Sequence, residues 1–331
     1  MSAISEQAAL LQHEWDTDPR WAGITRNYSA QHVIRLRGRV AGEDHGLARR
    51  GASRLWDLLN RQDGVLALGA VTGSQAVQAA RAGVQAIYRP GWQAADENLA
   101  GRMAPVVAGA EAGVGGAPAA FELMTAMTEA GAAGVRFDDQ LPAGSGHAYS
   151  GQRVLIPTAQ HIEALTAARL AADVAGVPAL VIARTGARAA SLVTSAIDER
   201  DHEFLTGERT AEGFYRMEPG LYACGTRALA FAPYADLLWL ETPAPDLAAA
   251  RAFACVIHSQ YPGKLLAYSC SPSYSWRAHL DDASIAWFQR ELAAIGYRFQ
   301  VTIPVGFSAT DEPAPYLSRL ARDARPAYAQ S

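Results

Sequence analysis

Short apolar runs alternate with longer Ala-rich stretches along the chain from about residue 65 onward. The short runs are nearly continuous in Val, Ile, Leu and Ala, as is typical of strands that are buried on both faces of a parallel sheet. Eight runs are predicted as strands: 65–70, 86–91, 105–111, 134–139, 179–185, 237–242, 264–271 and 299–306.

The stretches between these runs have the spacing of amphipathic helices. Apolar residues recur at i, i+3 and i+4, which predicts helices that include 120–131, 161–176, 246–260 and 284–296. Eight alternating strand and helix units predict an α/β fold, a (β/α)8 TIM barrel, with the active site at the C-terminal ends of the strands. Residues 1–60 are predicted to form an N-terminal helical extension, with helices over 29–40 and 47–63, that clasps the barrel at 61–331 or a neighbouring subunit. We expect extension and barrel to form one domain.

Composition narrows the class of protein. The chain has 331 residues, of which 50% are hydrophobic and 19% charged, so it can bury a sizeable core. The net charge is −4 and the basic residues are scattered, which argues against a nucleic-acid partner. The sequence lacks an apolar run of the ~18 residues that a membrane span needs, and it lacks a secretory signal pattern. We therefore expect a cytoplasmic protein without a membrane partner.

Cysteine usage argues against two further classes of site. Cys224, Cys255 and Cys270 are the three cysteines, and they are widely spaced. Such spacing does not fit a disulfide framework or a structural zinc site. The glycine-rich stretch GAEAGVGG follows a strand without the spacing of a phosphate-binding loop, so it is a weak nucleotide motif.

Polar residues gather at the predicted strand ends, where a barrel places its active site. They are Trp92, Asp96, Glu97, Glu111, Asp138, Asp139, Arg184, Glu241, Ser269, Ser271 and Ser273. An arginine beside hydroxyls suits a small anionic substrate such as a dicarboxylate or oxo acid, because a guanidinium binds a carboxylate with two hydrogen bonds. The alternative is that Glu111, Asp138 and Arg184 form only a structural ion-pair network.

A Gly/Ser-rich loop, AGSGHAYSG, contains two candidate acid/base groups, His147 and Tyr149. The loop is long enough to close over a pocket and bring a proton donor to a substrate. The alternative is that both side chains are simply solvated.

Long segments of the chain resemble isocitrate lyase, of the isocitrate lyase/phosphoenolpyruvate mutase superfamily. Among them are LGAVTGSQAVQAARAGVQAIY, EAGVGGAPAAFELMTAMTEAGAAGVRFDDQL and DERDHEFLTGERTAEGFYR, and the similarity covers nearly the whole chain. The resemblance implies a (β/α)8 barrel, Mg²⁺-dependent cleavage of a carbon–carbon bond in a hydroxy acid, and tetramers with exchanged C-terminal helices. We therefore expect a homo-oligomer, either a dimer or a tetramer. Because the chain ends soon after the final barrel helix, we do not assume that C-terminal helices are exchanged between subunits.

The catalytic loop departs from the family pattern. The family has Lys-Lys-Cys-Gly-His, in which the cysteine donates a proton, and the nearest equivalent here is Gly144-Ser145-Gly146-His147. A serine hydroxyl is far less acidic than a thiol, so Ser145 does not simply replace it. His147 or Tyr149 is then the expected proton donor.

The metal and substrate positions also depart. Gly109 stands where the family has the Asp that binds Mg²⁺ directly, while Glu111 and Asp138 match acidic residues around the metal. These two groups alone are expected to hold Mg²⁺ weakly or not at all. The family's substrate-binding Ser-Gly-Trp is Pro90-Gly91-Trp92 here, and Ser269 replaces an Asn beside the retained Ser271 and Ser273. Arg184, Trp239 and Glu241 match the family.

Two hypotheses follow from this combination. The first is a divergent lyase-like enzyme that acts on a small hydroxy or oxo carboxylic acid and is not a true isocitrate lyase. Its predicted catalytic groups are Ser145, His147, Tyr149, Arg184 and Glu241, and its predicted substrate-binding groups are Gly91, Trp92, Arg184, Ser269, Ser271 and Ser273. The second hypothesis is a non-catalytic homologue that binds a carboxylate ligand or a partner lyase subunit.

Overall fold

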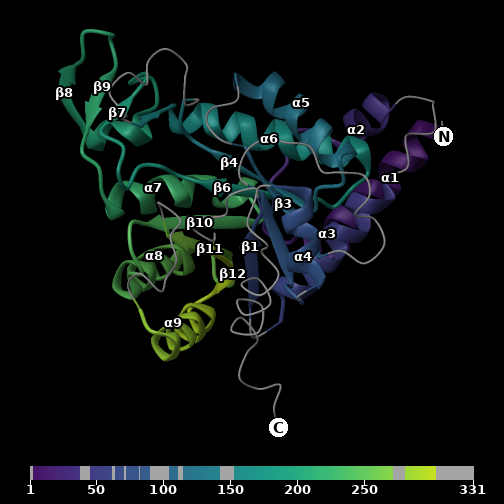
Figure 1. Ribbon diagram of the computed structural model, residues 1–331. Coiled ribbons are helices and arrows are strands. Elements are labelled where there is room, and N and C mark those ends of the chain that lie inside the picture. Colours follow the sequence, from purple (N-terminus) through teal and green to yellow (C-terminus); the bar gives the residue numbers. More distant parts are fainter. Residues whose placement is uncertain are drawn as a thin grey trace.

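A closed barrel of eight parallel strands lies at the centre of the computed structural model (Figure 1). The structure describes residues 3–37, 45–61, 64–70, 72–81, 83–89, 104–110, 115–141, 153–270 and 280–302. The barrel strands are β1 (Val65–Gly69), β2 (Ala86–Arg89), β3 (Val106–Ala110), β4 (Gly134–Asp138), β6 (Leu180–Arg184), β10 (Leu237–Thr242), β11 (Leu265–Cys270) and β12 (Tyr297–Thr302). They follow one another around the barrel in chain order, and β12 pairs with β1 to close it. The predicted (β/α)8 fold is confirmed, and every predicted strand overlaps one of these eight.

The register of the strands brings the polar strand ends together. Asp138 on β4 is the partner of Arg184 on β6, and Arg184 is in turn the partner of Trp239 on β10. Glu241 on β10 is the partner of Ser269 on β11. Side chains two residues apart on a strand point to the same face, so Trp239 and Glu241 project to the same side of the sheet.

Helices surround the barrel, and the four helices predicted between strands are confirmed. The barrel helices are α4 (Gly73–Arg81), α5 (Gly116–Glu129), α6 (Thr158–Ala175), α7 (Leu221–Phe231), α8 (Leu247–Gln260) and α9 (Asp282–Ala294). Local signals fix several ends: Asp246 accepts a hydrogen bond from the Ala249 amide at the start of α8, at 2.9 Å. Helix α6 ends at Gly176, whose φ of 65° is favourable for glycine.

The N-terminal helices pack against the barrel of the same chain. They are α1 (Ala3–Thr17), the 3₁₀ helix η1 (Pro19–Trp21), α2 (Ala30–Arg37) and α3 (Gly46–Leu59). Arg20 Nη1 lies 2.6 Å from Asp236 Oδ1, just before β10, and Arg26 Nε lies 2.8 Å from Asp173 Oδ2 on α6. Of the two predicted contacts for this extension, the structure therefore contains the one with its own barrel.

A second, four-stranded sheet was not predicted from the sequence. Its strands are β5 (Val154–Leu155), β7 (Leu192–Val193), β8 (Leu205–Arg209) and β9 (Tyr215–Met217), in the order β5-β7-β9-β8. The 3₁₀ helix η3 (Glu199–Phe204) lies between β7 and β8 in the chain, and η4 (Ala232–Tyr234) lies between α7 and β10. β5, β7 and β9 are two or three residues long, which is too short to establish a period-two alternation, and the five residues of β8 lack a buried side that such an alternation needs. In Figure 1, β8 and β9 project at the upper left, away from the N-terminal helices.

None of the helices in the described ranges is both long enough and apolar enough to cross a membrane.

Candidate active site

The centre of the candidate site is an ion-pair cluster at the ends of β4, β6 and β10. Arg184 Nη1 donates to Asp138 Oδ2 at 2.5 Å, and Arg184 Nη2 donates to Glu241 Oε1 at 2.5 Å. Asp138 is 5% exposed and Arg184 is 4% exposed. In the structure, Arg184 therefore forms ion pairs with two carboxylates of its own chain, those of Asp138 and Glu241.

The charges in this cluster stabilise one another. Burial alone would lower the pKa of Arg184, but the carboxylates of Asp138 and Glu241 outweigh that effect and raise it above the ordinary value. Burial alone would raise the pKa of Glu241, but the guanidinium groups of Arg184, Arg136 and Arg153 lower it below the usual range. Arg184 and Glu241 are therefore charged in the folded protein at neutral pH.

Ser269 extends the cluster onto β11. Its hydroxyl oxygen accepts a hydrogen bond from Trp239 Nε1 at 2.9 Å, and the hydroxyl donates to Glu241 Oε2 at 3.5 Å. The side chain is buried. The hydroxyl of Ser269 thus links Trp239 and Glu241, and the predicted role of Ser269 in substrate binding stays a prediction.

Arg136, two residues before Asp138 on β4, is a second buried guanidinium beside the same carboxylate. Its Nε lies 2.9 Å from Asp138 Oδ1, and its Nη2 lies 3.0 Å from Asp138 Oδ2. Its guanidinium carbon is 5.4 Å from the centre of the Tyr88 ring and 5.1 Å from that of Trp239. These distances are within the range of cation–π interactions. Sequence analysis did not single out Arg136.

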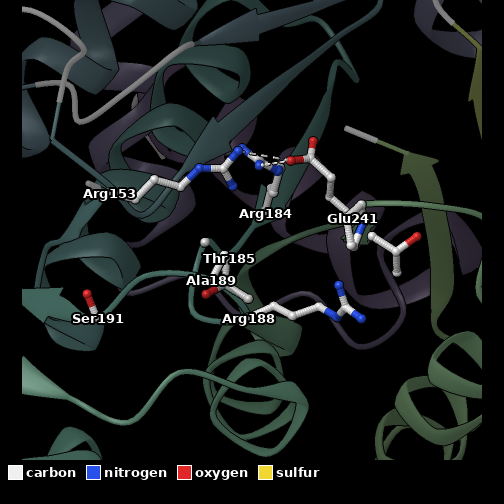
Figure 2. A pocket seen from close by; sticks show the side chains of 10 residues that line it. Arg153, Arg184, Thr185, Arg188, Ala189, Ser191 and Glu241 are labelled. Carbon is white, nitrogen blue, oxygen red and sulfur yellow. Dashed lines mark hydrogen bonds and ion pairs between the residues drawn. The ribbon is translucent and has the colours of Figure 1, made fainter. Parts of the chain in front are cut away.

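A cavity of about 460 Å³ opens beside the cluster (Figure 2). Its polar lining includes Arg153, Arg184, Thr185, Arg188, Ser191 and Glu241. Figure 2 shows the guanidinium groups of Arg153 and Arg184 directed at Glu241, whereas Arg188 extends separately below them. The Nη2 atom of Arg153 lies 3.3 Å from Glu241 Oε1, and that of Arg188 lies 3.5 Å from Asp246 Oδ2. The cavity is thus bordered by three cations and one carboxylate.

Asp139, the neighbour of Asp138, is committed to a separate buried network. Its carboxylate accepts from Arg227 Nη1 at 2.7 Å, from the Thr185 hydroxyl at 2.6 Å and from the Gly186 amide at 2.8 Å. Arg227 also donates to Asp201, at 3.0 Å. Asp139, one of the polar strand-end residues that the sequence singles out, is thus held within the protein and fixes the loop after β6.

Comparison with known proteins decides the family. A profile of the isocitrate lyase family matches residues 99–209 and 206–330. Isocitrate lyase 1 of Mycobacterium tuberculosis is 49% identical over 347 residues, which cover 92% of this chain and 81% of the relative. The isocitrate lyase of Escherichia coli strain K12 is 48% identical over 350 residues, covering 91% of this chain and 80% of the relative. The chain belongs to the isocitrate lyase family.

Solved structures of similar proteins agree with the fold of this family member. Oxaloacetate acetylhydrolase, in complex with 3,3-difluorooxalacetate, has a TM-score of 0.54 at 18% identity, and the match covers 82% of this chain and 84% of the acetylhydrolase chain. A 2,3-dimethylmalate lyase has a TM-score of 0.53 at 20% identity, and the match covers 85% of this chain and 87% of the lyase chain. At these identities the likeness concerns the fold.

The described residues do not fit the Mg²⁺ ion that membership of the isocitrate lyase family implies. A Cβ atom built on Gly109 would lie 2.5 Å from the Tyr88 hydroxyl oxygen, so the space of a metal-binding side chain is filled. Both oxygens of Asp138 face guanidinium groups. Within the described ranges, no three His, Cys, Asp or Glu side chains are grouped as a metal site requires. Mg²⁺ needs several oxygen ligands in octahedral geometry, which this arrangement does not supply.

The contact between Gly109 and Tyr88 gives a stability prediction. Gly109→Ala is expected to lower the free energy of unfolding by about 1–3 kcal/mol, because the new methyl group meets a buried, packed ring. In a Tyr88→Phe background the nearest ring atom would be Cζ, at 3.4 Å, so the same change is expected to cost less than about 1 kcal/mol. Urea denaturation of the four proteins measures both values.

Gly51→Ala on α3 is a suitable control, because its added Cβ lies 3.4 Å from the Ala133 side chain, an ordinary contact. Equal costs of Gly109→Ala in the two backgrounds would show that the Tyr88 hydroxyl does not occupy this space.

Several predicted site residues of this isocitrate lyase family member lie outside the described residues. They are Gly91, Trp92, Asp96, Glu97, Glu111, Ser145, His147, Tyr149, Ser271 and Ser273. Their roles therefore stay predictions.

The cavity also adds residues that sequence analysis missed. Arg153 stands directly before β5, and Arg188 follows the end of β6 by four residues. The position of Arg188 after a barrel strand was a usable signal, because loops at that end of a strand line the active site of a barrel. Arg153 had no such signal, since the short strand β5 was itself not predicted.

Proposed function

We propose that this protein is a lyase-type enzyme that acts on a small hydroxy or oxo carboxylic acid, and that isocitrate is not its substrate. The observation that carries the proposal is the cavity bordered by Arg153, Arg184 and Arg188. Its volume of about 460 Å³ is within the usual range for small-molecule sites. Membership of the isocitrate lyase family supports carbon–carbon bond chemistry.

Arg153 and Arg188 are proposed to bind the carboxylate of the substrate. Arg184 already donates to Asp138 and Glu241, so its terminal nitrogens are committed within the protein. The side chains of Arg153 and Arg188 are 38% and 26% exposed, and each makes one longer ion pair. They keep donors that can bind a substrate carboxylate through two hydrogen bonds. The hydroxyls of Thr185 and Ser191 border the same space.

Arg184 and Glu241 are proposed to orient the reacting part of the substrate. Arg184 holds Glu241 in a fixed position, and Glu241 keeps its charge because its pKa is lowered. Glu241 is proposed to accept the hydroxyl proton of a bound hydroxy acid while the carbon–carbon bond next to that hydroxyl breaks and leaves its electron pair on the departing fragment. The carbon that holds this electron pair then takes a proton, and the donor is assigned, as a prediction, to His147 or Tyr149 of the Gly/Ser-rich loop.

The test is binding and turnover of a series of acids. Glyoxylate, oxaloacetate, malonate, succinate and citrate are added singly, and thermal unfolding and product formation are followed. At least one acid is expected to raise the unfolding temperature, because a ligand that binds only the native state stabilises it. Arg188→Gln is expected to weaken that binding at least ~10-fold, as loss of a charge-assisted contact does.

Arg251→Gln is the matched control, because Arg251 is an exposed arginine paired with Glu291 on the outer helices. It is expected to leave binding unchanged. If none of the acids binds, the proposal is wrong. Binding without any turnover would instead support the alternative, a non-catalytic homologue that binds a carboxylate.

A further inference from the structure

We propose that Arg136 is the fixed cation of this site, a guanidinium that takes the place of a divalent metal, so that the barrel binds its carboxylate ligand independently of metal. This inference rests on the proposed function for the identity of the ligand. It rests on separate observations for the exclusion of the metal. Arg136 is then a positioning and specificity-determining residue that acts through Asp138.

The first observation is the location of Arg136 in the barrel. Its register partner on β3 is Gly109, so the side chain of Arg136 lies beside a strand position that has no side chain of its own. The Tyr88 hydroxyl fills the space next to Gly109. Gly109, Tyr88 and Arg136 are thus neighbours, and the Tyr88 hydroxyl occupies the volume that a carboxylate side chain at position 109 would need.

The second observation is how firmly Arg136 is held. The rings of Tyr88 and Trp239 are in contact, with centroids 5.3 Å apart, and the guanidinium of Arg136 lies over both. Its side chain is 7% exposed. Its planar group pairs with both oxygens of Asp138, at 2.9 Å and 3.0 Å. A charge fixed on three sides is preorganised, so it needs no rearrangement when a ligand binds.

The third observation is the balance of charge. Arg136, Arg153 and Arg184 contribute three positive charges, and Asp138 and Glu241 contribute two negative charges, which leaves a formal charge of +1 on these residues. A doubly charged cation is repelled by such a cluster, whereas a carboxylate is attracted. Asp138 cannot turn to a metal without giving up its pairs with Arg136 and Arg184.

The first experiment uses the wild-type protein with Mn²⁺ and malonate as probes. Binding of ~1 mM Mn²⁺, a divalent ion suited to oxygen ligands, is followed by the electron paramagnetic resonance signal of the free ion. The signal is expected to stay unchanged by the protein, with and without malonate. Malonate affinity, measured by calorimetry, is expected to be the same in Mn²⁺ and in EDTA. Stoichiometric Mn²⁺ binding that strengthens malonate binding would overturn the inference.

The second experiment compares Arg136→Gln and Arg136→Lys. Arg136→Gln is expected to weaken malonate binding at least ~10-fold, and Arg136→Lys is expected to recover part of the loss, because it restores the charge without the planar fork. Asp138 keeps its pair with Arg184 in both variants. Unchanged affinity in a folded Arg136→Gln variant would overturn the inference, and the Mn²⁺ measurement decides the matter if this variant does not fold.

The outcomes separate the inference from the proposed function. Loss of malonate binding in Arg188→Gln but not in Arg136→Gln would leave the function standing and the inference wrong. If wild-type protein binds none of the acids, the proposed function fails, while the Mn²⁺ measurement still tests the exclusion of the metal.

Discussion

Isocitrate, supplied at saturating concentration with Mg²⁺, is expected to be cleaved at least ~10⁴-fold more slowly than a typical enzyme turnover of about 10 per second. Two groups that would accelerate the cleavage are expected to be missing from this chain. The family's proton-donating cysteine has no counterpart around His147, and a positioned general acid alone contributes about 10²–10⁴-fold. Gly109 has no carboxylate and the Tyr88 hydroxyl fills the space beside it, so we expect the Lewis acid that would stabilise developing charge to be missing too.

Formation of glyoxylate and succinate measures this rate. The isocitrate lyase of Escherichia coli strain K12, 48% identical to this chain, is the positive control in the same buffer. Circular dichroism verifies that the test protein is folded. Turnover of isocitrate at about 10 per second, an ordinary enzyme rate, would mean that this chain is a true isocitrate lyase despite its loop and its Gly109.

Replacement of Arg184 by Met is expected to lower the free energy of unfolding by about 3–5 kcal/mol, which is typical when one partner of a buried ion pair is removed. Arg184 is 4% exposed and donates to Asp138 and Glu241. Without it, the buried Asp138 keeps Arg136 and the partly buried Glu241 keeps Arg153 as the remaining cationic partners that the described residues provide. Urea denaturation gives the free energy directly.

Two controls isolate the cause of that loss. Arg251→Met removes an exposed ion pair and is expected to cost at most about 1 kcal/mol. The double change Arg184→Met and Glu241→Gln removes one of the two carboxylates that lose Arg184, while Asp138 stays charged and keeps its pair with the buried Arg136, so this variant is expected to recover part of the stability. A cost below about 1 kcal/mol for Arg184→Met would show that Arg184 is not a structural member of this cluster.

The ion pairs of Glu241 with Arg184 and Arg153 also make the free energy of unfolding depend on pH. The pKa of Glu241 is lower in the folded protein than in the unfolded chain, where a Glu carboxyl titrates near pH 4.3. Its ion pairs therefore stabilise the fold above that pH, and their contribution is lost as the pH falls through the folded-state pKa. In Arg184→Met this loss in acid is expected to be smaller, because the main partner of Glu241 is already gone.

Arg184 illustrates why sequence left its role open. The sequence placed it at the end of a predicted strand with carboxylates nearby, and both a ligand contact and an internal ion pair were consistent with that. In the structure the internal pairs are present, with Asp138 and Glu241 as partners. Binding of the substrate carboxylate is consequently proposed for Arg153 and Arg188, whose side chains are more exposed than that of Arg184 and form longer ion pairs.

The sequence by itself determined the barrel and the set of residues at its strand ends. A strand that is buried on both faces is rich in apolar residues, so β6 is visible as the apolar run 180–183 that ends in Arg184, and β4 is visible as a shorter run that Arg136 interrupts before Asp138. Such signals are local, because a few consecutive residues contain them.

Only the tertiary structure decided which of those residues meet. Three contacts depend on strand register and barrel closure: the approach of the Tyr88 hydroxyl to Gly109, the position of the Arg136 guanidinium over two rings, and the convergence of Arg153 with Arg184. Register and closure arise from pairings between residues far apart in the chain, and no local pattern specifies them.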